Sequence, residues 1–157
     1  MTITNVMRLL SKEGISFDSC EYEVDESDLS GVHAAEALGL PPESVFKTLV
    51  AKGDKNGINV FVIPVAEELD LKKCAMVSGN KKVEMIKVSQ LLPLTGYIRG
   101  GCSPIGMKKK YPTFIDETAV LSEQISISAG QRGVQILIRA DDLRQYISAE
   151  YADIIKT

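Results

Sequence analysis

The sequence is poor in the residues that bind metals or form disulfides. It has one histidine, His33, and three cysteines, Cys20, Cys74 and Cys102, which lie far apart and form no C-x-x-C pair. A structural zinc site uses closely spaced thiolates and imidazoles, and a disulfide framework uses an even set of cysteines. The sequence therefore predicts neither a structural zinc site nor a disulfide framework.

Long apolar segments are missing as well. No apolar run is long enough to cross a bilayer, and Arg8, Lys12 and Glu13 interrupt the first apolar residues, so neither a membrane span nor a signal peptide is expected. Internal repeats and low-complexity segments are also absent. The chain has 157 residues, of which 45% are hydrophobic and 25% charged, as in ordinary soluble proteins. We expect one domain over residues 1–157, located in the cytoplasm.

Positive charge is not in excess. The chain carries 18 Lys and Arg against 21 Asp and Glu, which gives a net charge of -3. Such a balance argues against a protein that coats nucleic acid through its overall charge, although a local basic stripe can still grip one phosphate backbone. Any contact with nucleic acid should therefore be local.

Helices are predicted where a capping residue precedes apolar residues spaced three or four positions apart. Glycines at positions 14, 39 and 79 are expected to end three of them, and Pro93 is expected to stop a short fourth helix. Asp141 should cap the last helix, which runs through Tyr146 and Ile147. The first three begin near Thr4, Gly31 and Asp70, and the fourth contains Leu91 and Leu92.

Strands are predicted where β-branched and aromatic residues alternate with polar ones or form short continuous runs. Segments 45–51 and 58–65 should form a hairpin that turns near Asn56 and Gly57. Strands and helices mix without strict alternation, which predicts an α+β domain with a mixed, largely antiparallel sheet or partial barrel surrounded by helices. The other predicted strands are 20–24, Thr113–Asp116, Ile125–Ser128 and Val134–Ile138.

Residues 94–110 form the most unusual stretch, LTGYIRGGCSPIGMKKK. Gly100 and Gly101 allow another backbone or a ligand to come close, and Pro104 restricts the chain. Three lysines follow at positions 108 to 110 and place positive charge beside this segment. A rigid, exposed loop is predicted here, and functional residues are often found on such loops.

Three chemistries fit this loop in part. Gly101 and Gly106 approach the spacing of a phosphate-binding G-x-x-x-x-G-K-[ST] loop, but Met107 stands where the lysine is needed. Cys102 could act as a nucleophile whose pKa the lysines lower, but His33 is distant in sequence and no other base is evident. In the third reading, loop N–H groups and a lysine hold an ester and stabilise its oxyanion. The spacing of the residues leaves all three open.

Lys47 is a charged residue within the apolar segment VFKTLVA. A lysine at such a position is rarely left buried without a partner. We therefore expect Lys47 either to point towards solvent or to form an ion pair.

Several segments together resemble the YbaK/EbsC family of bacterial aminoacyl-tRNA deacylases. They are FKTLV at 46–50, ELDLKK at 68–73, the loop TGYIRGGCSPIGMKK and SAGQRG at 128–133. The start of the chain, with TNVMRLL, a strand bearing Tyr22 and GVHAAEALGL, is also similar to that family. Within the wider group, GGCSPIGMKK resembles the branch that acts on Cys-tRNA(Pro).

The resemblance implies hydrolysis, in trans, of cysteine wrongly attached to proline tRNA, without metal or cofactor. Cysteine and proline are similar in size, and a binding pocket rejects a near-isostere by only about 1 to 3 kcal/mol, so a synthetase benefits from a second, hydrolytic site. In this family the thiol of the substrate is thought to attack its own ester. The implied partners are tRNA(Pro) carrying cysteine and prolyl-tRNA synthetase, and no membrane.

The same resemblance implies roles for individual residues. Lys47, Gly100 and Gly101 would be catalytic, with Lys47 orienting the terminal ribose or supporting developing negative charge. The substrate pocket would be formed by Tyr22, Phe46, Thr48 and Ser128, and the tRNA would be bound by Arg99, Lys108, Lys109 and Arg132.

A second hypothesis is a non-catalytic regulatory or tRNA-binding module with the same fold. Such a module could lose Lys47 and the pocket glycines without consequence. The chain keeps both, which favours the enzyme.

Overall fold

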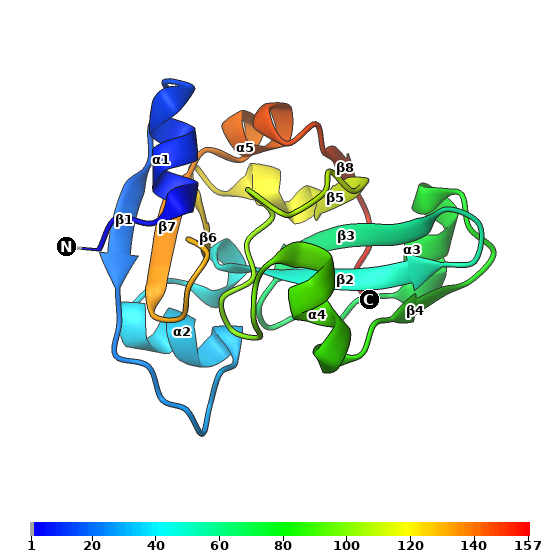
Figure 1. Ribbon diagram of the computed structural model, residues 1–157, viewed down its shortest axis with the longest axis horizontal. Coiled ribbons are helices and arrows are strands. Elements are labelled where there is room, and N and C mark those ends of the chain that lie inside the picture. Colours follow the sequence, from blue (N-terminus) through cyan, green and yellow to red (C-terminus); the bar gives the residue numbers. More distant parts are fainter. Residues whose placement is uncertain (1) are drawn as a thin grey trace.

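Two β-sheets with helices around them form the structure, a computed structural model that describes residues 2–157 (Figure 1). One sheet has three strands and the other has five. The helices are α1 (Asn5–Lys12), α2 (Gly31–Leu38), α3 (Leu71–Ser78), α4 (Val88–Thr95) and α5 (Ala140–Tyr146), with short 3-10 turns at Pro42–Ser44 and Glu117–Leu121. The strands are β1 (Asp18–Glu21), β2 (Phe46–Gly53), β3 (Gly57–Pro64), β4 (Val83–Met85), β5 (Thr113–Asp116), β6 (Ile125–Ser128), β7 (Val134–Ile138) and β8 (Glu150–Ala152).

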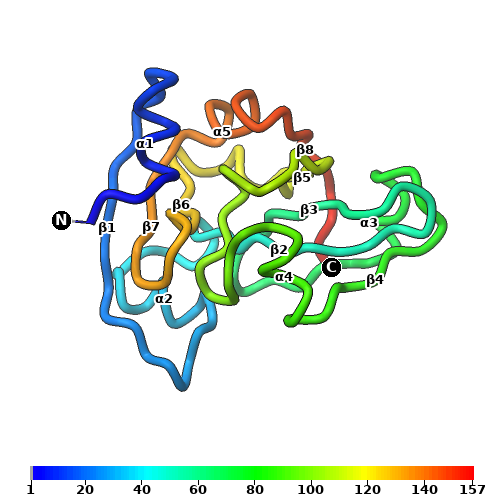
Figure 2. Tube along the Cα trace, viewed as in Figure 1, coloured from blue at the N-terminus to red at the C-terminus, as the bar shows by residue number. Residues whose placement is uncertain are grey.

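The three-stranded sheet is antiparallel, in the order β1-β7-β6. It joins distant parts of the sequence, because Asp18 of β1 pairs with Leu137 of β7 (Figure 2). Alternation along β6 and β7 sends isoleucines such as Ile127 and Ile136, both fully buried, into the main hydrophobic core. The opposite face of β6 and β7 carries Ser126, Ser128 and Gln135.

The five-stranded sheet is mixed, in the order β4-β2-β3-β5-β8. β2 and β3 form the expected hairpin, which is confirmed from Phe46 opposite Pro64 to Gly53 opposite Gly57. β5 pairs in parallel with both β3 and β8. The expected α+β fold is thus confirmed, and within residues 2–157 the sheets remain open and form no closed barrel.

The capping residues explain where most helices begin and end. The hydroxyl of Thr4 accepts a hydrogen bond from the N–H of Met7, and the carboxylate of Asp70 accepts bonds from Lys72 and Lys73. The glycines at positions 39 and 79 end α2 and α3 in the left-handed conformation. The predictions for these three helices are confirmed.

Two predicted helix boundaries are wrong. Helix α4 passes through Pro93 and ends at Thr95, followed by Gly96 with a φ of 87°. Proline removes one N–H bond, but a short, largely exposed helix loses little by it and stops where the glycine allows the chain to turn. Helix α5 begins after Arg139, so Asp141 lies in its first turn and is not the N-cap. A carboxylate there still complements the helix dipole.

The prediction of the first strand was shifted, and two short strands were missed. β1 ends at Glu21, although the N–H of Tyr22 still donates to the carbonyl of Gly133 over 2.9 Å. β4 and β8 have three residues each, which is too short for an alternation pattern to be recognised. No helix among the described residues is long and apolar enough to cross a membrane.

Candidate active site

A small pocket of about 90 Å³ lies where the first residues of β2 meet α2, the β6–β7 strands and the loop after α4. Its wall contains Lys47 and Gly100, to which the family resemblance assigns catalytic roles. Four residues predicted to bind substrate, Tyr22, Phe46, Thr48 and Ser128, line it as well. The fold thus brings together residues that are up to 106 positions apart in the sequence (22 to 128).

Lys47 is half-buried in this wall and has no ion-pair partner within 4.0 Å among residues 2–157. Burial lowers the pKa of its ammonium group, while the more distant carboxylates of Glu68 and Glu67 act in the opposite direction. Neither expectation for Lys47 is met, because the side chain is neither freely solvated nor paired. It presents a positive charge to the pocket.

The rest of the polar wall consists mainly of hydrogen-bond donors. The Oγ1 atom of Thr48 is buried and has no hydrogen-bond partner among the described residues. The Oγ of Ser128 accepts from the N–H of Gly130 over 3.1 Å, which leaves its own hydrogen free to donate. No Asp or Glu lines the pocket. The wall is therefore suited to a ligand rich in oxygen acceptors.

Gln135 is a pocket residue that the sequence analysis missed. It lies opposite Ser128 in the β6–β7 ladder, and its Oε1 accepts a hydrogen bond from Ser126 Oγ over 2.9 Å. Ser126 thereby fixes the amide of Gln135, whose nitrogen remains available as a donor. The available signal was the polar residue within the apolar strand VQILI, on the same face as the serines of ISIS.

The two glycines of the loop have different environments. Gly100 has a φ of 86° and lines the pocket. Gly101 is buried, its N–H donates to the carbonyl of Ile98 over 3.0 Å, and it does not line the pocket. A Cβ on Gly101 would stand 3.1 Å from main-chain atoms of Gln131 and Arg132. Gly101 thus allows the two loops to pack against each other.

The four residues expected to bind tRNA lie around the loop, outside this pocket. Arg99, Lys108 and Lys109 are exposed. Arg132 is already engaged, because its Nε donates to the carbonyl of Arg99 over 2.8 Å and its Nη1 lies 3.0 Å from Glu26 Oε2. A role of Arg132 in binding tRNA stays a prediction, and its guanidinium would have to exchange partners.

Cys102 lines the pocket, but its thiol is not activated. Burial raises its pKa to about 12, which is opposite to the effect expected from the neighbouring lysines. His33 is not part of the pocket wall, and its ring lies edge-on to Tyr22 with the ring centroids 6.4 Å apart. The hypothesis of a nucleophilic Cys102 with a histidine base is therefore wrong for this geometry.

The phosphate-binding loop hypothesis is also wrong. Such a loop leads into a helix whose N-terminus faces the phosphate, whereas residues 100–112 remain irregular until β5 begins. Among residues 2–157, no three His, Cys, Asp or Glu side chains are grouped so as to hold a metal ion. What remains is a pocket of fixed donors around one unpaired ammonium group.

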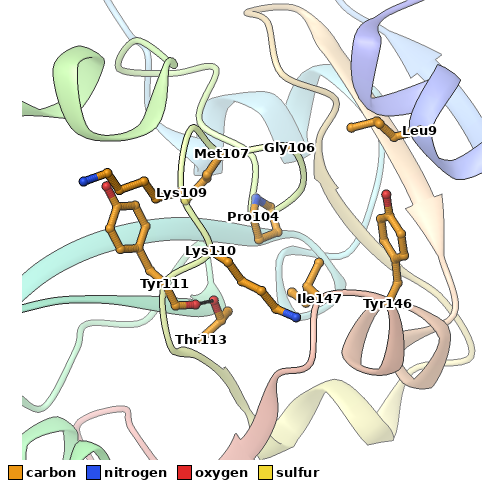
Figure 3. A pocket seen from close by; sticks show the side chains of 10 residues that line it. All are labelled: Leu9, Pro104, Gly106, Met107, Lys109, Lys110, Tyr111, Thr113, Tyr146 and Ile147. Atoms are coloured by element: carbon orange, nitrogen blue, oxygen red, sulfur yellow. Dashed lines mark hydrogen bonds between the residues drawn. The ribbon is translucent and has the colours of Figure 1, made fainter.

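A second, larger hollow of about 350 Å³ lies between α1, residues 104–113 and α5 (Figure 3). Of the residues to which the family resemblance assigns a role, only Lys109 lines it. The small pocket is the better candidate for the reaction centre, because the unpaired Lys47 and the unsatisfied Thr48 face it.

The fold is that of an α+β domain with a small pocket whose polar wall consists mainly of hydrogen-bond donors. A solved structure described as a proposed trans-editing enzyme for prolyl tRNA synthetase has the same fold, with a TM-score of 0.84 over 99% of this chain and 100% of that chain. The two are 22% identical, so this likeness concerns the fold alone. The family model of the aminoacyl-tRNA editing domain matches residues 29–146. The chain belongs to the aminoacyl-tRNA editing domain family.

Two curated proteins are similar to this chain in sequence. EbsC of Enterococcus faecalis, a proposed Cys-tRNA(Pro)/Cys-tRNA(Cys) deacylase, is 46% identical over 151 residues, which cover 96% of this chain and 92% of EbsC. A proline–tRNA ligase of Shouchella clausii is 27% identical over 77% of this chain, but the match spans only 21% of the ligase. These relatives confirm the resemblance to the EbsC family, and the protein is of the aminoacyl-tRNA deacylase type.

Proposed function

We propose that the protein removes cysteine from Cys-tRNA(Pro) in trans, with the thiol of the substrate as the nucleophile. The name of EbsC includes this activity, and the match to a segment of a proline–tRNA ligase supports a link to proline tRNA. The observation that carries the proposal is the unpaired ammonium of Lys47 in a donor-lined pocket whose only thiol, Cys102, has a pKa raised to about 12.

The size of the pocket supports a small aminoacyl group. A volume of about 90 Å³ leaves little room beyond a side chain such as that of cysteine. Phe46 and Val45 are buried residues of the wall and limit its depth. The rest of the tRNA must then remain outside, with only the aminoacylated end inserted.

The proposed reaction has two steps. The sulfur of the bound cysteine attacks its own carbonyl carbon, the C–S bond forms, and the C–O bond to the ribose breaks. The ribose oxygen leaves with a proton, and the four-membered thiolactone is then opened by water to give free cysteine. A thiol with an ordinary pKa of about 8.5 needs little activation for attack on an ester.

Each pocket group has a part in this scheme. Lys47 stabilises negative charge that develops on the carbonyl oxygen or holds the terminal ribose, as a preorganised donor does. Thr48 and Ser128 donate hydrogen bonds to the aminoacyl ester, and Tyr22 and Phe46 enclose it. Gly100 has no side chain, which lets the main chain of its loop come close to the ester. Prolyl-tRNA synthetase is the expected partner that delivers the tRNA.

The direct test measures deacylation of Cys-tRNA(Pro) by the wild type, Lys47→Ala and Cys102→Ala. We expect Lys47→Ala to be inactive and Cys102→Ala to keep most of its activity. Wild-type protein should also leave Ser-tRNA(Pro) intact, because serine lacks the thiol. Loss of activity in Cys102→Ala with retention in Lys47→Ala would contradict the mechanism. A wild type that binds but does not deacylate would favour the non-catalytic module.

A further inference from the structure

The second hollow, with about 350 Å³, is much larger than the reaction pocket with about 90 Å³. Helix α1 contributes Leu9, the end of helix α5 contributes Tyr146 and the next residue Ile147, and residues 104–113 contribute the remaining side (Figure 3). Leu9, Tyr146 and Ile147 pack against the main core, so this wall is held in place by the fold.

The two sides of the hollow differ in character. Tyr146 and Leu9 stand together on one side, and Lys109 and Tyr111 on the other (Figure 3). The hydroxyl of Tyr111 donates to the carbonyl of Leu94 over 2.7 Å, which fixes its ring. The side formed by Leu9 and Tyr146 is apolar and aromatic, as are protein surfaces on which nucleic-acid bases stack.

The hollow also carries uncompensated positive charge. Lys109 lies on the side of Tyr111, and the ammonium end of Lys110 reaches towards Ile147 (Figure 3). In the part of the chain that the structure describes, Lys108, Lys109 and Lys110 have no carboxylate within 4.0 Å, and Lys110 bonds only to Ser148 Oγ, over 3.3 Å. On the apolar side of the hollow, burial and, to a smaller extent, the carboxylate of Glu13 raise the pKa of Tyr146. Lys109 and Lys110 line the hollow, and in a protein with a net charge of -3 they favour an anion such as phosphate there.

One loop connects the two cavities. Gly100 and Cys102 line the reaction pocket, and Pro104 and Gly106 line the second hollow. The two residues from Cys102 to Pro104 span at most about 7 Å of chain. An extended strand with one small group in the first cavity and a larger planar group in the second would match their two volumes.

We propose that the second hollow binds the nucleotide next to the esterified one in the single-stranded 3′ end of the tRNA. Its base lies against Tyr146 and Leu9, and its phosphate is bound by Lys109 and Lys110. The inference rests on the proposed function, since it takes the ester to occupy the reaction pocket. It adds a nucleotide-binding subsite to which Tyr146 and Lys110 belong.

The test compares two substrates, Cys-tRNA(Pro) and 3′-cysteinyl-adenosine, which lacks the preceding nucleotide. Tyr146→Ala and the double variant Lys109→Ala/Lys110→Ala should each lose about tenfold in kcat/KM on the tRNA, within the range of one stacked base. Both should cleave cysteinyl-adenosine at the wild-type rate. Lys55→Ala, which removes an exposed lysine from the β2–β3 turn, is the matched control and should lose nothing on either substrate.

Equal losses on both substrates, or no loss on the tRNA, would overturn the subsite. Tyr146→Phe keeps the ring and should behave as wild type, which separates stacking from damage to the fold. The exposed lysine variants serve the same purpose, because they leave the core untouched.

A binding measurement separates this inference from the proposed function. An uncharged RNA oligonucleotide ending in CCA is titrated into wild-type protein and the variants. If the wild type cleaves no cysteine ester but binds the oligonucleotide more tightly than Tyr146→Ala does, the proposed function fails and the subsite stands. If the wild type cleaves Cys-tRNA(Pro) and all variants bind the oligonucleotide equally, the subsite fails alone.

Discussion

At its half-buried position, the charge of Lys47 costs the fold stability. Its ammonium group is half-buried without an ion pair in the described part of the chain, and burial lowers its pKa. Since its pKa is lower in the folded state than in the unfolded state, the unfolded chain binds more protons, and stability rises as the pH rises through the folded-state pKa. At neutral pH the charged form of Lys47 therefore lowers the free energy of unfolding.

Lys47→Met should accordingly separate stability from activity. We expect the melting temperature at pH 7 to be equal to or higher than that of the wild type, because an uncompensated half-buried charge is removed. Deacylation of Cys-tRNA(Pro) should fall by at least about 100-fold, the usual loss for a donor that stabilises an oxyanion. Calorimetry and single-turnover deacylation check the two parts, and a variant that is active but unstable would contradict the role given to Lys47.

The reactivity of the three cysteine thiols can also be predicted. Burial raises the pKa of Cys74 and Cys102 to about 12 and also raises that of Cys20. At pH 8 a thiol with a pKa of about 12 is ionised in roughly one molecule in ten thousand, so it reacts slowly with iodoacetamide. Mass spectrometry should find little labelling of Cys74 and Cys102 in the native protein and full labelling in urea. Fast labelling of Cys102 alone would reopen its role as a nucleophile.

At the scale of elements, the packing of two loops depends on Gly101. A Cβ at this position would stand 3.1 Å from the main chain of Gln131 and Arg132, which cannot move aside as a side chain end can. Gly101→Ala should cost about 1 to 3 kcal/mol of stability and reduce kcat, because the loop that carries Gly100 is displaced. Gly57→Ala is the control, since its φ is 77° and no atom lies within 4 Å of the added Cβ. It should lose some stability but keep its kinetics.

Arg132 connects three segments around the reaction pocket. It bonds the carbonyl of Arg99, pairs with Glu26, and follows the turn after β6. If its task is to hold the loop, Arg132→Met and Glu26→Gln should lower kcat, and the double variant should be no worse than Arg132→Met. The loss should be equal for Cys-tRNA(Pro) and cysteinyl-adenosine. A loss confined to tRNA and relieved at low salt would instead support the earlier prediction that Arg132 binds phosphate.

The elements that the sequence predicted well are those with strong local signals. Capping by Thr4 and Asp70 and the turn at Asn56 and Gly57 are decided by neighbouring residues, so they could be read directly. The pairing of β1 with β7 depends on contacts across more than a hundred residues and has no local signal. The position of Pro93 within α4 could not be predicted from local sequence either, because the tolerance of a helix for a proline depends on how exposed the helix is.

The candidate site was predicted from motifs and not from chemistry. Resemblance placed Lys47, Thr48 and Ser128 together, and the fold brings them to one pocket. The place of Gln135 in the pocket could not be predicted, because a single polar residue in an apolar strand gives no functional signal by itself. Its role becomes evident only in the structure, where Ser126 and Ser128 lie beside it on the same face.

At the scale of the whole molecule, tRNA binding should be weak and strongly dependent on salt. The net charge is -3, and the exposed residues Arg99 and Lys108 to Lys110 are the basic group next to the candidate site. Each lysine removed from this group should reduce the slope of log Kobs against log salt by about 0.7 to 0.9. Binding measured between low and physiological salt checks this for Lys108→Ala. Tight binding at physiological salt would mean that the protein needs no synthetase to hold the tRNA.

The pairing of β1 with β7 also has a consequence for the time at which the protein becomes able to act. The N–H of Tyr22 donates to the carbonyl of Gly133, so the wall that carries Tyr22 forms only when residues 18–22 have met residues 133–137. Closing so long a loop is entropically costly and tends to be late in folding. A nascent chain whose last strands are still held in the ribosome would therefore have its hairpin and its first four helices but no working pocket.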